Sequence, residues 1–374
     1  MRLSSEESKR VVYVSPYYDP AVISGANRRF DELTRRFARD LGANFTLVVA
    51  KGKTPPWWAQ KNNGAKLVEV RYGFNHLSKF SAARAIGNVL DALPPSVVVI
   101  ESVPVPYRAL KRHAHFQVVY DFRYFTGDSK STLYRAFFAP YLKSQWSRAE
   151  FMVTCSEFSI QELVKHIGFD PKRTVRSYFG IHEELVDEGD KPLPQKELDI
   201  FYAAHFEKRK NHEPLIRAIA LVDKHMKVLF TGADNGLRAS LEALAKSLGL
   251  TNVWFGRVSD KELWEAYRKA RLYASPTIYE GFGIPVIESL ALGTPVVASD
   301  LPFSHEVGGD LITYFDPHNP GDIARAIREQ FAQPKIASRE TVRAHMQKFF
   351  WENIYKKFSD DLRDFSTGSV KHLR

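Results

Sequence analysis

Residues 275–300 read SPTIYEGFGIPVIESLALGTPVVASD. The run that ends at Ser275 predicts a strand, and the residues from Pro285 to Leu292 predict a helix, with a glycine-containing loop between them. Proline suits a first helical turn, because its missing N–H is not needed there. A strand that leads through glycines into a helix is typical of a βα unit in a parallel sheet.

The same alternation runs along the whole chain. The strands expected in the first half are Val11 to Ser15, Phe45 to Ala50, Val68 to Tyr72, Val97 to Glu101, Gln117 to Asp121 and Phe151 to Cys155. Those expected in the second half are Leu198 to Ala203, Lys227 to Thr231, Val253 to Gly256, Leu272 to Ser275 and Pro295 to Ser299. Amphipathic segments separate them. The pattern predicts an α/β chain with two doubly wound, Rossmann-like parallel-sheet domains.

The segment Glu183 to Gln195, EELVDEGDKPLPQ, interrupts this rhythm with an acidic cluster and two prolines, and we expect it to be the linker. The expected domains are 1–185 and 196–345, followed by a C-terminal helix in 346–374. The apolar face of the helical segment Ile336 to Phe365 must be covered, and crossing back onto the first domain would cover it. Two such domains usually bind a ligand in the cleft between them.

Composition excludes a disordered or fibrous chain, since 44% of the 374 residues are hydrophobic and 26% are charged. The formal charge of +10 suggests contact with nucleic acid or a membrane. It is concentrated in residues 1–180, which hold 27 basic and 15 acidic side chains. One cysteine, Cys155, and no apolar run of about 18 residues favour a cytoplasmic protein, free to touch the inner face of the cell membrane.

Glu280 and Glu288 lie on either side of the predicted helix start in residues 275–300. Gly281 and Gly283 let the backbone approach a ligand, and the N–H groups of a helix start suit a phosphate or a sugar hydroxyl group. Carboxylates so placed accept hydrogen bonds from hydroxyl-rich ligands. The alternative is a pair of loop glycines beside two solvated glutamates.

Further blocks occur in order around this stretch. They are Tyr202 to Asn211, YAAHFEKRKN; Gly256 to Asp260, GRVSD; Gly293 to Ser299, GTPVVAS; and His305 to Asp310, HEVGGD. Together with the Glu-x7-Glu spacing, they resemble the GT4 family of retaining glycosyltransferases, which have the GT-B fold. The resemblance extends over most of the chain, and the block from Thr294 to Asp316 is similar to mannosyltransferases of bacterial surface-polysaccharide assembly.

The resemblance implies roles for residues of the second domain. Glu288 would bind the ribose of the nucleotide, Glu280 would lie near the transferred sugar, and Lys210 would contact the diphosphate. A positioned cation stabilises the charge of a leaving diphosphate. The resemblance implies that such a cation replaces a divalent metal, so no metal and no cofactor is expected. The remaining donor-binding positions that it implies are Gly232, Val258, Phe282, Gly283 and Ile284.

One position of the second domain departs from the family. His205 stands where the family usually has Arg, and it offers one directed donor with a pH-dependent charge in place of a permanently charged fork. We expect this departure to affect the strength of diphosphate binding but not the fold. The alternative for His205 is a structural histidine at a strand end.

The first domain matches less well. Ser24 replaces the first glycine of the family's Gly-Gly loop, although Gly25 and the N–H of Ala26 can still cradle a phosphate at a helix start; simple turn chemistry is the alternative. The strand Val118 to Arg123 resembles one that ends in a catalytic-site His or Arg, which places Arg123 at the donor sugar or the acceptor. The Asn expected beside Gly180 is absent.

Two signals remain open. His113 and His115 lie in a basic segment that reads as helix to loop, without a carboxylate cluster, so we expect no metal there. The segment from Leu133 to Arg148 mixes aromatic and basic residues at helical spacing. It is either a core-packed helix or a face that docks on anionic lipid.

The resemblance therefore implies a metal-independent, retaining hexosyltransferase. Its expected partners are a nucleotide-sugar donor, with GDP-mannose as the best choice, and a glycan or lipid-linked acceptor in polysaccharide assembly. Two alternatives stay open: a GT-B enzyme of other chemistry, such as a sugar-nucleotide epimerase, or a non-catalytic basic binder of nucleotides or nucleic acid. Nucleic acid is not expected, because the glutamate pair would repel a polyanion.

Overall fold

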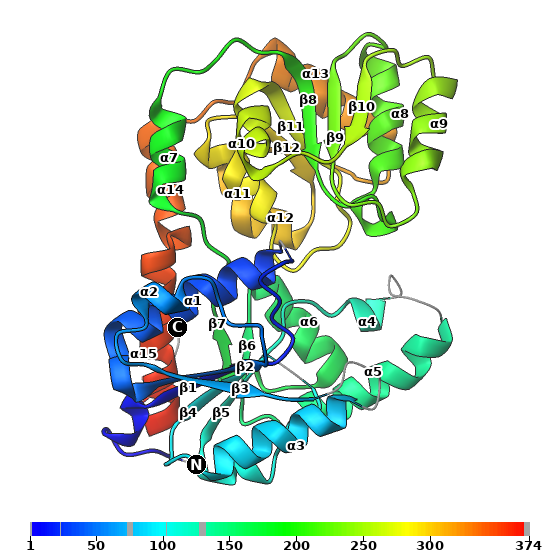
Figure 1. Ribbon diagram of the computed structural model, residues 1–374. Helices are drawn as coiled ribbons and strands as arrows, with labels where there is room; N and C mark the ends of the chain where they lie inside the picture. The colour runs from blue at the N-terminus through cyan, green and yellow to red at the C-terminus, as the bar shows by residue number, and fades with distance from the viewer. Residues whose placement is uncertain (1, 23, 73–77, 102, 127–131, 370–374) are drawn as a thin grey trace. The chain divides into compact units, whose positions relative to one another are not determined.

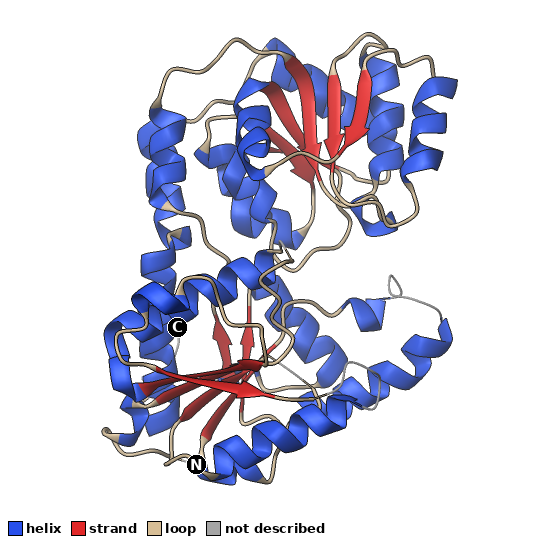
Figure 2. Cartoon of the chain, viewed as in Figure 1, coloured by secondary structure: helices blue, strands red, loops and turns tan. Residues whose placement is uncertain are grey.

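The computed structural model describes every residue except 1, 23, 73–77, 102, 127–131 and 370–374. The side chains of 78–80, 132–135, 260 and 261 also lie outside the description. The chain forms two compact units. The first comprises residues 1–180 and 351–374, and the second comprises Ile181–Phe350. Each unit is a parallel sheet with helices on both faces (Figures 1 and 2), and we describe each by itself.

The sheet of the first unit has the order β3-β2-β1-β4-β5-β6-β7. Its strands are β1 (Val11–Ser15), β2 (Phe45–Ala50), β3 (Lys66–Val70), β4 (Val97–Ile100), β5 (Ala114–Val118), β6 (Phe151–Thr154) and β7 (Thr174–Arg176). The α-helices are α1 (Gly25–Leu41), α2 (Trp58–Lys61), α3 (Ser78–Asp91), α4 (Arg123–Thr126), α5 (Thr132–Trp146), α6 (Glu157–Ile167) and α15 (Trp351–Thr367). Short 3-10 turns are Glu7–Lys9, Gly42–Asn44, Ala109–Arg112 and Pro171–Arg173.

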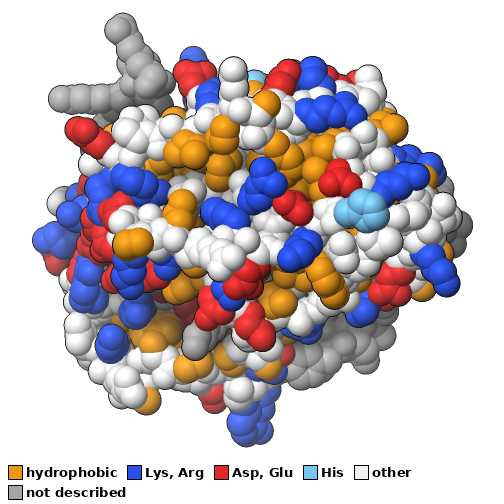
Figure 3. Space-filling model, turned by 90° about the horizontal axis from the view of Figure 1, so that it is seen from above, with side chains coloured by type: hydrophobic (Ala, Val, Ile, Leu, Met, Phe, Trp, Pro, Cys, Tyr) orange, Lys and Arg blue, Asp and Glu red, His pale blue; other side chains and the backbone are white. Residues whose placement is uncertain are grey.

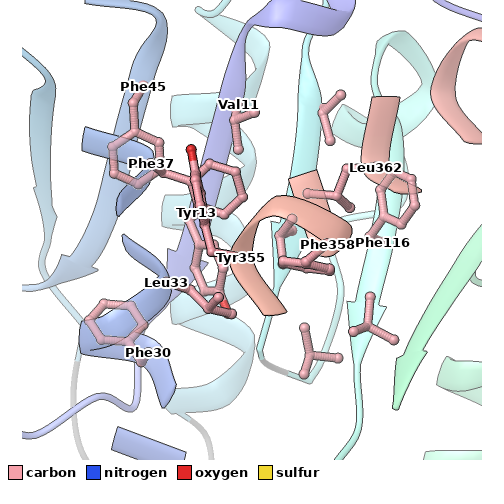
Figure 4. Close-up of a cluster of buried hydrophobic side chains, with 14 of the residues drawn as sticks. Val11, Tyr13, Phe30, Leu33, Phe37, Phe45, Phe116, Tyr355, Phe358 and Leu362 are labelled. Carbon is pink, nitrogen blue, oxygen red and sulfur yellow. The ribbon is translucent and has the colours of Figure 1, made fainter. Parts of the chain in front are cut away.

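Strand alternation divides the core of this unit into two layers. Val11 and Tyr13 of β1 point into one cluster with α1 and α15, whereas Val12 and Val14 point into another on the opposite face. Figure 4 shows the first cluster, in which Tyr355, Phe358 and Leu362 of α15 lie beside side chains from the sheet and from α1. The expected return of the C-terminal helix to the first domain is confirmed.

The second sheet has the order β10-β9-β8-β11-β12-β13. Its strands are β8 (Leu198–Ala203), β9 (Val228–Thr231), β10 (Val253–Gly256), β11 (Ala270–Ser275), β12 (Val296–Ser299) and β13 (Thr313–Phe315). The α-helices are α7 (Glu183–Asp190), α8 (His212–Val222), α9 (Arg238–Ser247), α10 (Asp260–Lys269), α11 (Ile284–Ala291), α12 (Pro302–Gly308), α13 (Pro320–Ala332) and α14 (Arg339–Met346). Turns of 3-10 helix are Lys208–Lys210, Gly309–Leu311 and Gln347–Phe349.

The structure corrects the expected linker. Its first eight residues form α7, which buries Leu185 and Val186 in the second unit. Glu183 and Glu184 occupy its first turn, where acidic side chains suit the helix dipole. Asp190 at its end is 2.7 Å from Arg339 Nε. The acidic cluster therefore supports a helix that packs by its apolar side.

Some expected elements are shifted or divided, and two observed strands were not expected. β5 begins at Ala114, three residues before the expected Gln117, and β7 and β13 were not expected. β7 and β13 are three-residue edge strands, too short to show an alternating pattern. The long C-terminal helix is two helices, α14 and α15, separated by a 3-10 turn.

Charge is mixed over the face drawn in Figure 3, where Lys and Arg alternate with Asp and Glu around apolar patches among the described residues. Within the described part of the chain, no helix combines the length and the apolar character needed to cross a bilayer.

Candidate functional site

The candidate site lies at the carboxyl edge of the second sheet. β8 is the first strand of this sheet, and it lies between β9 and β11, so the strand order reverses beside it. In open parallel sheets, the carboxyl ends of the strands at such a reversal form the usual ligand site. The loops after β8 and β11 carry Lys210 and Glu280 to this edge.

Lys210 and Glu280 form a direct ion pair. Lys210 Nζ donates a hydrogen bond to Glu280 Oε1 at 2.8 Å. Only 8% of the Lys210 side chain and 23% of the Glu280 side chain are exposed. Burial lowers the pKa of Lys210, and the carboxylate opposes this only in part. Burial alone would raise the pKa of Glu280, but the charge and the hydrogen bond of Lys210 hold it below its ordinary value.

The two loops are tied together by further hydrogen bonds. The Tyr202 hydroxyl donates to the Lys210 carbonyl at 2.8 Å and lies 2.7 Å from Thr277 Oγ1. The Ile278 N–H donates to the Arg209 carbonyl at 2.9 Å, and Arg209 Nη1 donates to the Tyr279 carbonyl at 3.0 Å. These contacts hold the loop that carries Lys210 in place, and Glu280 holds its ammonium. Arg209 was not among the expected site residues, although it lies within the basic run of the YAAHFEKRKN block.

The start of α11 lies in the same loop. Gly283 has φ +109°, which favours glycine, and a Cβ there would come within 3.3 Å of Val307 Cγ2. Ile284 is the first helical residue, and proline follows it in the first turn as expected. Phe282 is buried, and its ring packs edge-on against Phe349 with centroids 5.6 Å apart. The helix start presents N–H groups and a positive dipole end.

Glu288 lies about one turn into α11 and is 4% exposed. Its Oε2 accepts a hydrogen bond from the Tyr267 hydroxyl at 3.3 Å. Burial raises the pKa of Tyr273 well above its ordinary value, and the charges of Glu280 and Glu288 both add to this rise. The two carboxylates therefore act on one buried phenol. The alternative of two solvated glutamates does not hold for Glu288.

Gly232 and Val258 follow the neighbouring strands β9 and β10. A Cβ on Gly232 would lie 2.1 Å from the Ala204 carbonyl oxygen, so the close approach of two loops requires glycine here. Val258 is half-buried beside Ser259, whose side chain and Glu262 form a capping box that starts α10.

His205 stands in the loop directly after β8. Partial burial lowers its pKa, and the positive charges of Lys210, Arg209 and Arg257 lower it further, against the opposing charge of Glu207. The ring is therefore neutral at neutral pH and adds no charge to the site in this state.

The other expected site residues belong to the first unit. Gly25 and Ala26 open α1, whose first turn is capped by Ser24 Oγ accepting from the Asn27 N–H at 3.1 Å. Arg123 begins α4, five residues beyond the end of β5, so the expectation that it ends a strand is wrong. Its Nε is 3.2 Å from Asp121 Oδ1, and 45% of the side chain is exposed.

The segment around His113 and His115 is also corrected. The 3-10 turn ends at Arg112, and His115 lies within β5, paired with Val98. The strand buries His115, and burial lowers its pKa to about 3. His113 is buried separately, with Nε2 3.1 Å from the Leu90 carbonyl. Within the described residues, no group of three or more His, Cys, Asp or Glu side chains is placed to hold a metal.

Comparisons with known proteins identify the family of both domains. Residues 186–347 match the family described as glycosyl transferases group 1, and residues 24–180 match the glycosyl transferase 4-like domain. The chain is 27% identical over 221 residues to the O-antigen chain mannosyltransferase B of Escherichia coli. This match covers 55% of this chain and 58% of that protein. It is 28% identical over 243 residues to a D-inositol 3-phosphate glycosyltransferase of Streptomyces bingchenggensis, with coverage of 57% and 52%. The chain spans about half the length of the curated relatives it matches.

A solved structure of similar fold is the sucrose-phosphate synthase of Thermosynechococcus elongatus. Its TM-score is 0.74 at 18% identity, and the likeness covers 96% of this chain and 99% of that chain. This likeness shows a shared two-sheet fold.

Proposed function

The chain belongs to the group 1 glycosyl transferases, with the GT-B fold and a GT4-like first domain, and from this premise we propose that it is a retaining hexosyltransferase. It moves a hexose from a nucleoside diphosphate sugar to a hydroxyl of a glycan or lipid-linked acceptor. The proposed donor is GDP-mannose, and the transferred hexose is mannose. The likeness to an O-antigen mannosyltransferase supports this choice. The chain is also similar to a D-inositol 3-phosphate glycosyltransferase, so inositol phosphate is the acceptor to test beside a glycan acceptor.

The Lys210–Glu280 pair is the observation that carries the proposal. A nearly buried ammonium at the reversal point of a parallel sheet is suited to a diphosphate, and its partner Glu280 lies in the loop that leads to Gly283 at a helix start. We assign to Lys210 the stabilisation of the leaving diphosphate and to Glu280 a position beside the transferred sugar. Glu288 is the proposed ribose ligand, because a buried carboxylate accepts hydrogen bonds from a vicinal diol.

In the proposed reaction, the bond from the anomeric carbon to the diphosphate breaks, and a bond to the acceptor oxygen forms on the same face of the sugar. The acceptor proton passes to the leaving diphosphate, so no protein nucleophile is needed. Lys210 and the N-terminus of α11 supply the positive charge that a divalent metal supplies in other transferases. The reaction should therefore proceed in a chelator.

The test incubates the protein with a panel of nucleotide-sugar donors in the presence of a chelator. It measures the release of nucleoside diphosphate and the formation of glycan product. Lys210→Met and Glu288→Gln should each lower kcat/KM at least a hundredfold, which is typical for loss of a charged transition-state contact. Lys246→Ala and Glu265→Ala change exposed charges of the same unit and are the matched controls. Unchanged activity in the first two variants would contradict the site. Sugar-nucleotide isomerisation, or nucleic-acid binding without donor turnover, would favour the two alternative functions.

We also propose peripheral contact with an anionic membrane through the first unit. α5 buries Leu142 and Trp146 as a core helix does, yet Phe137 on the same helix is 77% exposed. Lys143 lies in its last turn, and exposed aromatics beside basic residues suit a lipid headgroup surface. Co-sedimentation with anionic vesicles should fall in Phe137→Ser and should be weaker with zwitterionic vesicles. Equal sedimentation in all three cases would contradict the proposal.

A further inference from the structure

An arginine of α14 holds the last turn of α11. Arg339 Nη2 donates to the Ala291 carbonyl at 2.7 Å, and its Nη1 donates to the Leu290 carbonyl at 3.3 Å. The last carbonyls of a helix lack partners within the helix and form the negative end of its dipole, so a guanidinium suits them. Arg339 therefore caps the carboxyl end of the helix whose amino end is the candidate phosphate site.

Helix α7 fixes the guanidinium in turn. Arg339 Nε donates to Asp190 Oδ1 at 2.7 Å, and Nη2 also donates to the Val186 carbonyl at 2.9 Å. α7 approaches the same turn so closely that a Cβ on Gly189 would lie 2.0 Å from the Ala291 carbonyl oxygen. The Ala291 carbonyl is thus enclosed by the backbone of α7 and by Arg339, and this turn of α11 has little room to shift.

Glu288 belongs to the turn that Arg339 holds. The Leu292 N–H donates to the Glu288 carbonyl at 3.0 Å, which closes the last turn of the helix around Ala291. The residue is 4% exposed, and the Tyr267 hydroxyl donates to its carboxylate. A helical turn moves as a unit, because its hydrogen bonds fix the backbone. A displacement at Ala291 therefore also displaces Glu288.

The start of α11 has a support of its own. Phe349, which follows α14, packs edge-on against Phe282 with ring centroids 5.6 Å apart. His345 Nε2 lies 2.8 Å from the Val307 carbonyl, and the Val307 side chain is the neighbour that a Cβ on Gly283 would meet. Loss of Arg339 should therefore loosen the turn of Glu288 more than the helix start proposed for the diphosphate.

Recognition of a ribose by a carboxylate depends on accurate placement. Both hydroxyls of a vicinal diol donate to the carboxylate only when each lies about 2.5–3.0 Å from an oxygen with a favourable angle. A misplacement of about 1 Å is enough to weaken such a contact strongly.

We propose that Arg339 is a positioning residue for nucleotide recognition, which holds the last turn of α11 so that Glu288 reaches both ribose hydroxyls. The proposal rests on the function proposed above, in which Glu288 is the ribose ligand. Arg339 acts through the backbone of α11, and its loss should impair recognition of the ribose more than recognition of the diphosphate.

The test compares two ligands that differ only at the ribose. GDP and 2′,3′-dideoxy-GDP are titrated into the full chain by calorimetry, and the ratio of their dissociation constants measures the ribose contribution. The unaltered chain should bind GDP about tenfold more tightly, as expected for hydrogen bonds to a charged group. Glu288→Gln should lower this ratio to about twofold, because a neutral amide is the weaker acceptor. Arg339→Ala should lower it to about threefold, because the carboxylate remains but is misplaced.

Arg343→Ala is the matched control on the same helix. The Arg343 guanidinium pairs with Glu183, Asp187 and Asp190 of α7. Within the described part of the chain, no hydrogen bond joins it to α11, so this variant should keep the full ratio. Arg339→Lys retains the charge with a different donor geometry and should give an intermediate ratio.

Two further variants test the route through α11. Gly189→Ala displaces the Ala291 carbonyl from the side of α7 and should lower the ratio with Arg339 still in place. Arg339→Ala combined with Glu288→Gln should give the ratio of Glu288→Gln alone, because no carboxylate is left to position. Melting curves show which variants are folded at the titration temperature. Where Arg339→Ala is not folded, Arg339→Lys and Gly189→Ala decide.

Several results would overturn the proposal. One is a full ratio in Arg339→Ala, or in Gly189→Ala, when Glu288→Gln has lost it. Another is equal weakening of both ligands in Arg339→Ala, which would show that Arg339 only maintains the fold. Loss of the ratio in Arg343→Ala would have the same meaning. Failure of GDP to bind the unaltered chain, or an unchanged ratio in Glu288→Gln, would count against the proposed function and overturn both.

Discussion

Lys210 Nζ lies 2.8 Å from Glu280 Oε1, although 70 residues separate them in the chain. The pair joins the loops after the adjacent strands β8 and β11. The carboxylate of Glu280 favours the charged form of a nearly buried ammonium, at the position proposed for the diphosphate.

Removal of one partner of this pair should destabilise the second unit. Glu280→Gln leaves the Lys210 ammonium buried without its counter-charge, and since Glu280 is partly exposed we expect a loss of about 2 kcal/mol. Urea unfolding measures it, and Lys210→Met combined with Glu280→Gln should cost less than the sum of the single variants. The exposed pair Arg238–Glu242 is the control, where Glu242→Gln should cost under about 0.5 kcal/mol. Equal costs at the two sites would contradict this.

His205 should make nucleotide binding depend on pH. Its lowered pKa leaves it neutral at pH 7, so acidification through that pKa adds a positive charge and should tighten GDP binding. His205→Arg should bind about tenfold more tightly at neutral pH, because it offers a permanent charge-assisted contact. Calorimetry at several pH values tests both statements. In His205→Gln the imidazole is absent, so any remaining pH dependence of GDP binding comes from the ligand or from other groups. If this variant shows the same acid dependence as the unaltered chain, His205 is not the titrating group.

His212 should make the second unit sensitive to acid. It is 2% exposed, both ring nitrogens lack a partner among the described residues, and burial lowers its pKa to about 3. Below its ordinary pKa the unfolded chain binds a proton that the folded chain does not, so stability falls as pH drops from about 6.5 towards 3. At pH 5 this costs about 2 kcal/mol relative to neutral pH. His212→Phe should remove that loss in denaturant titrations, whereas His318→Gln, at an exposed histidine, should retain it.

Gly232→Ala should test the loop contact at the candidate site. Its Cβ would lie 2.1 Å from the Ala204 carbonyl oxygen, a backbone atom that cannot move aside alone, so we expect a loss of about 2–3 kcal/mol. Gly256→Ala is the matched control at the end of the next strand, with no atom within 4 Å of the added Cβ. Thermal melts compare the two. Equal melting temperatures would show that the loops are not packed as closely as described.

Local pattern predicted much of this molecule. The stretch from Ser275 to Asp300 predicted strand, glycine loop and helix, and α11 begins within one residue of the expected Pro285. These features depend on neighbours a few residues away. The basic segment around His113 did not reveal that His115 pairs with Val98 in a strand, because pairing and burial depend on distant residues.

By itself, the sequence determined the two parallel-sheet domains, the family, and the residue types that gather at the ends of the strands, since periodicity and short motifs are local properties. Only the tertiary structure decided that Glu288 is buried against Tyr267 and that Lys210 pairs with Glu280. These arrangements bring together side chains from separate strands, and their burial and charge balance exist only once the sheets have formed.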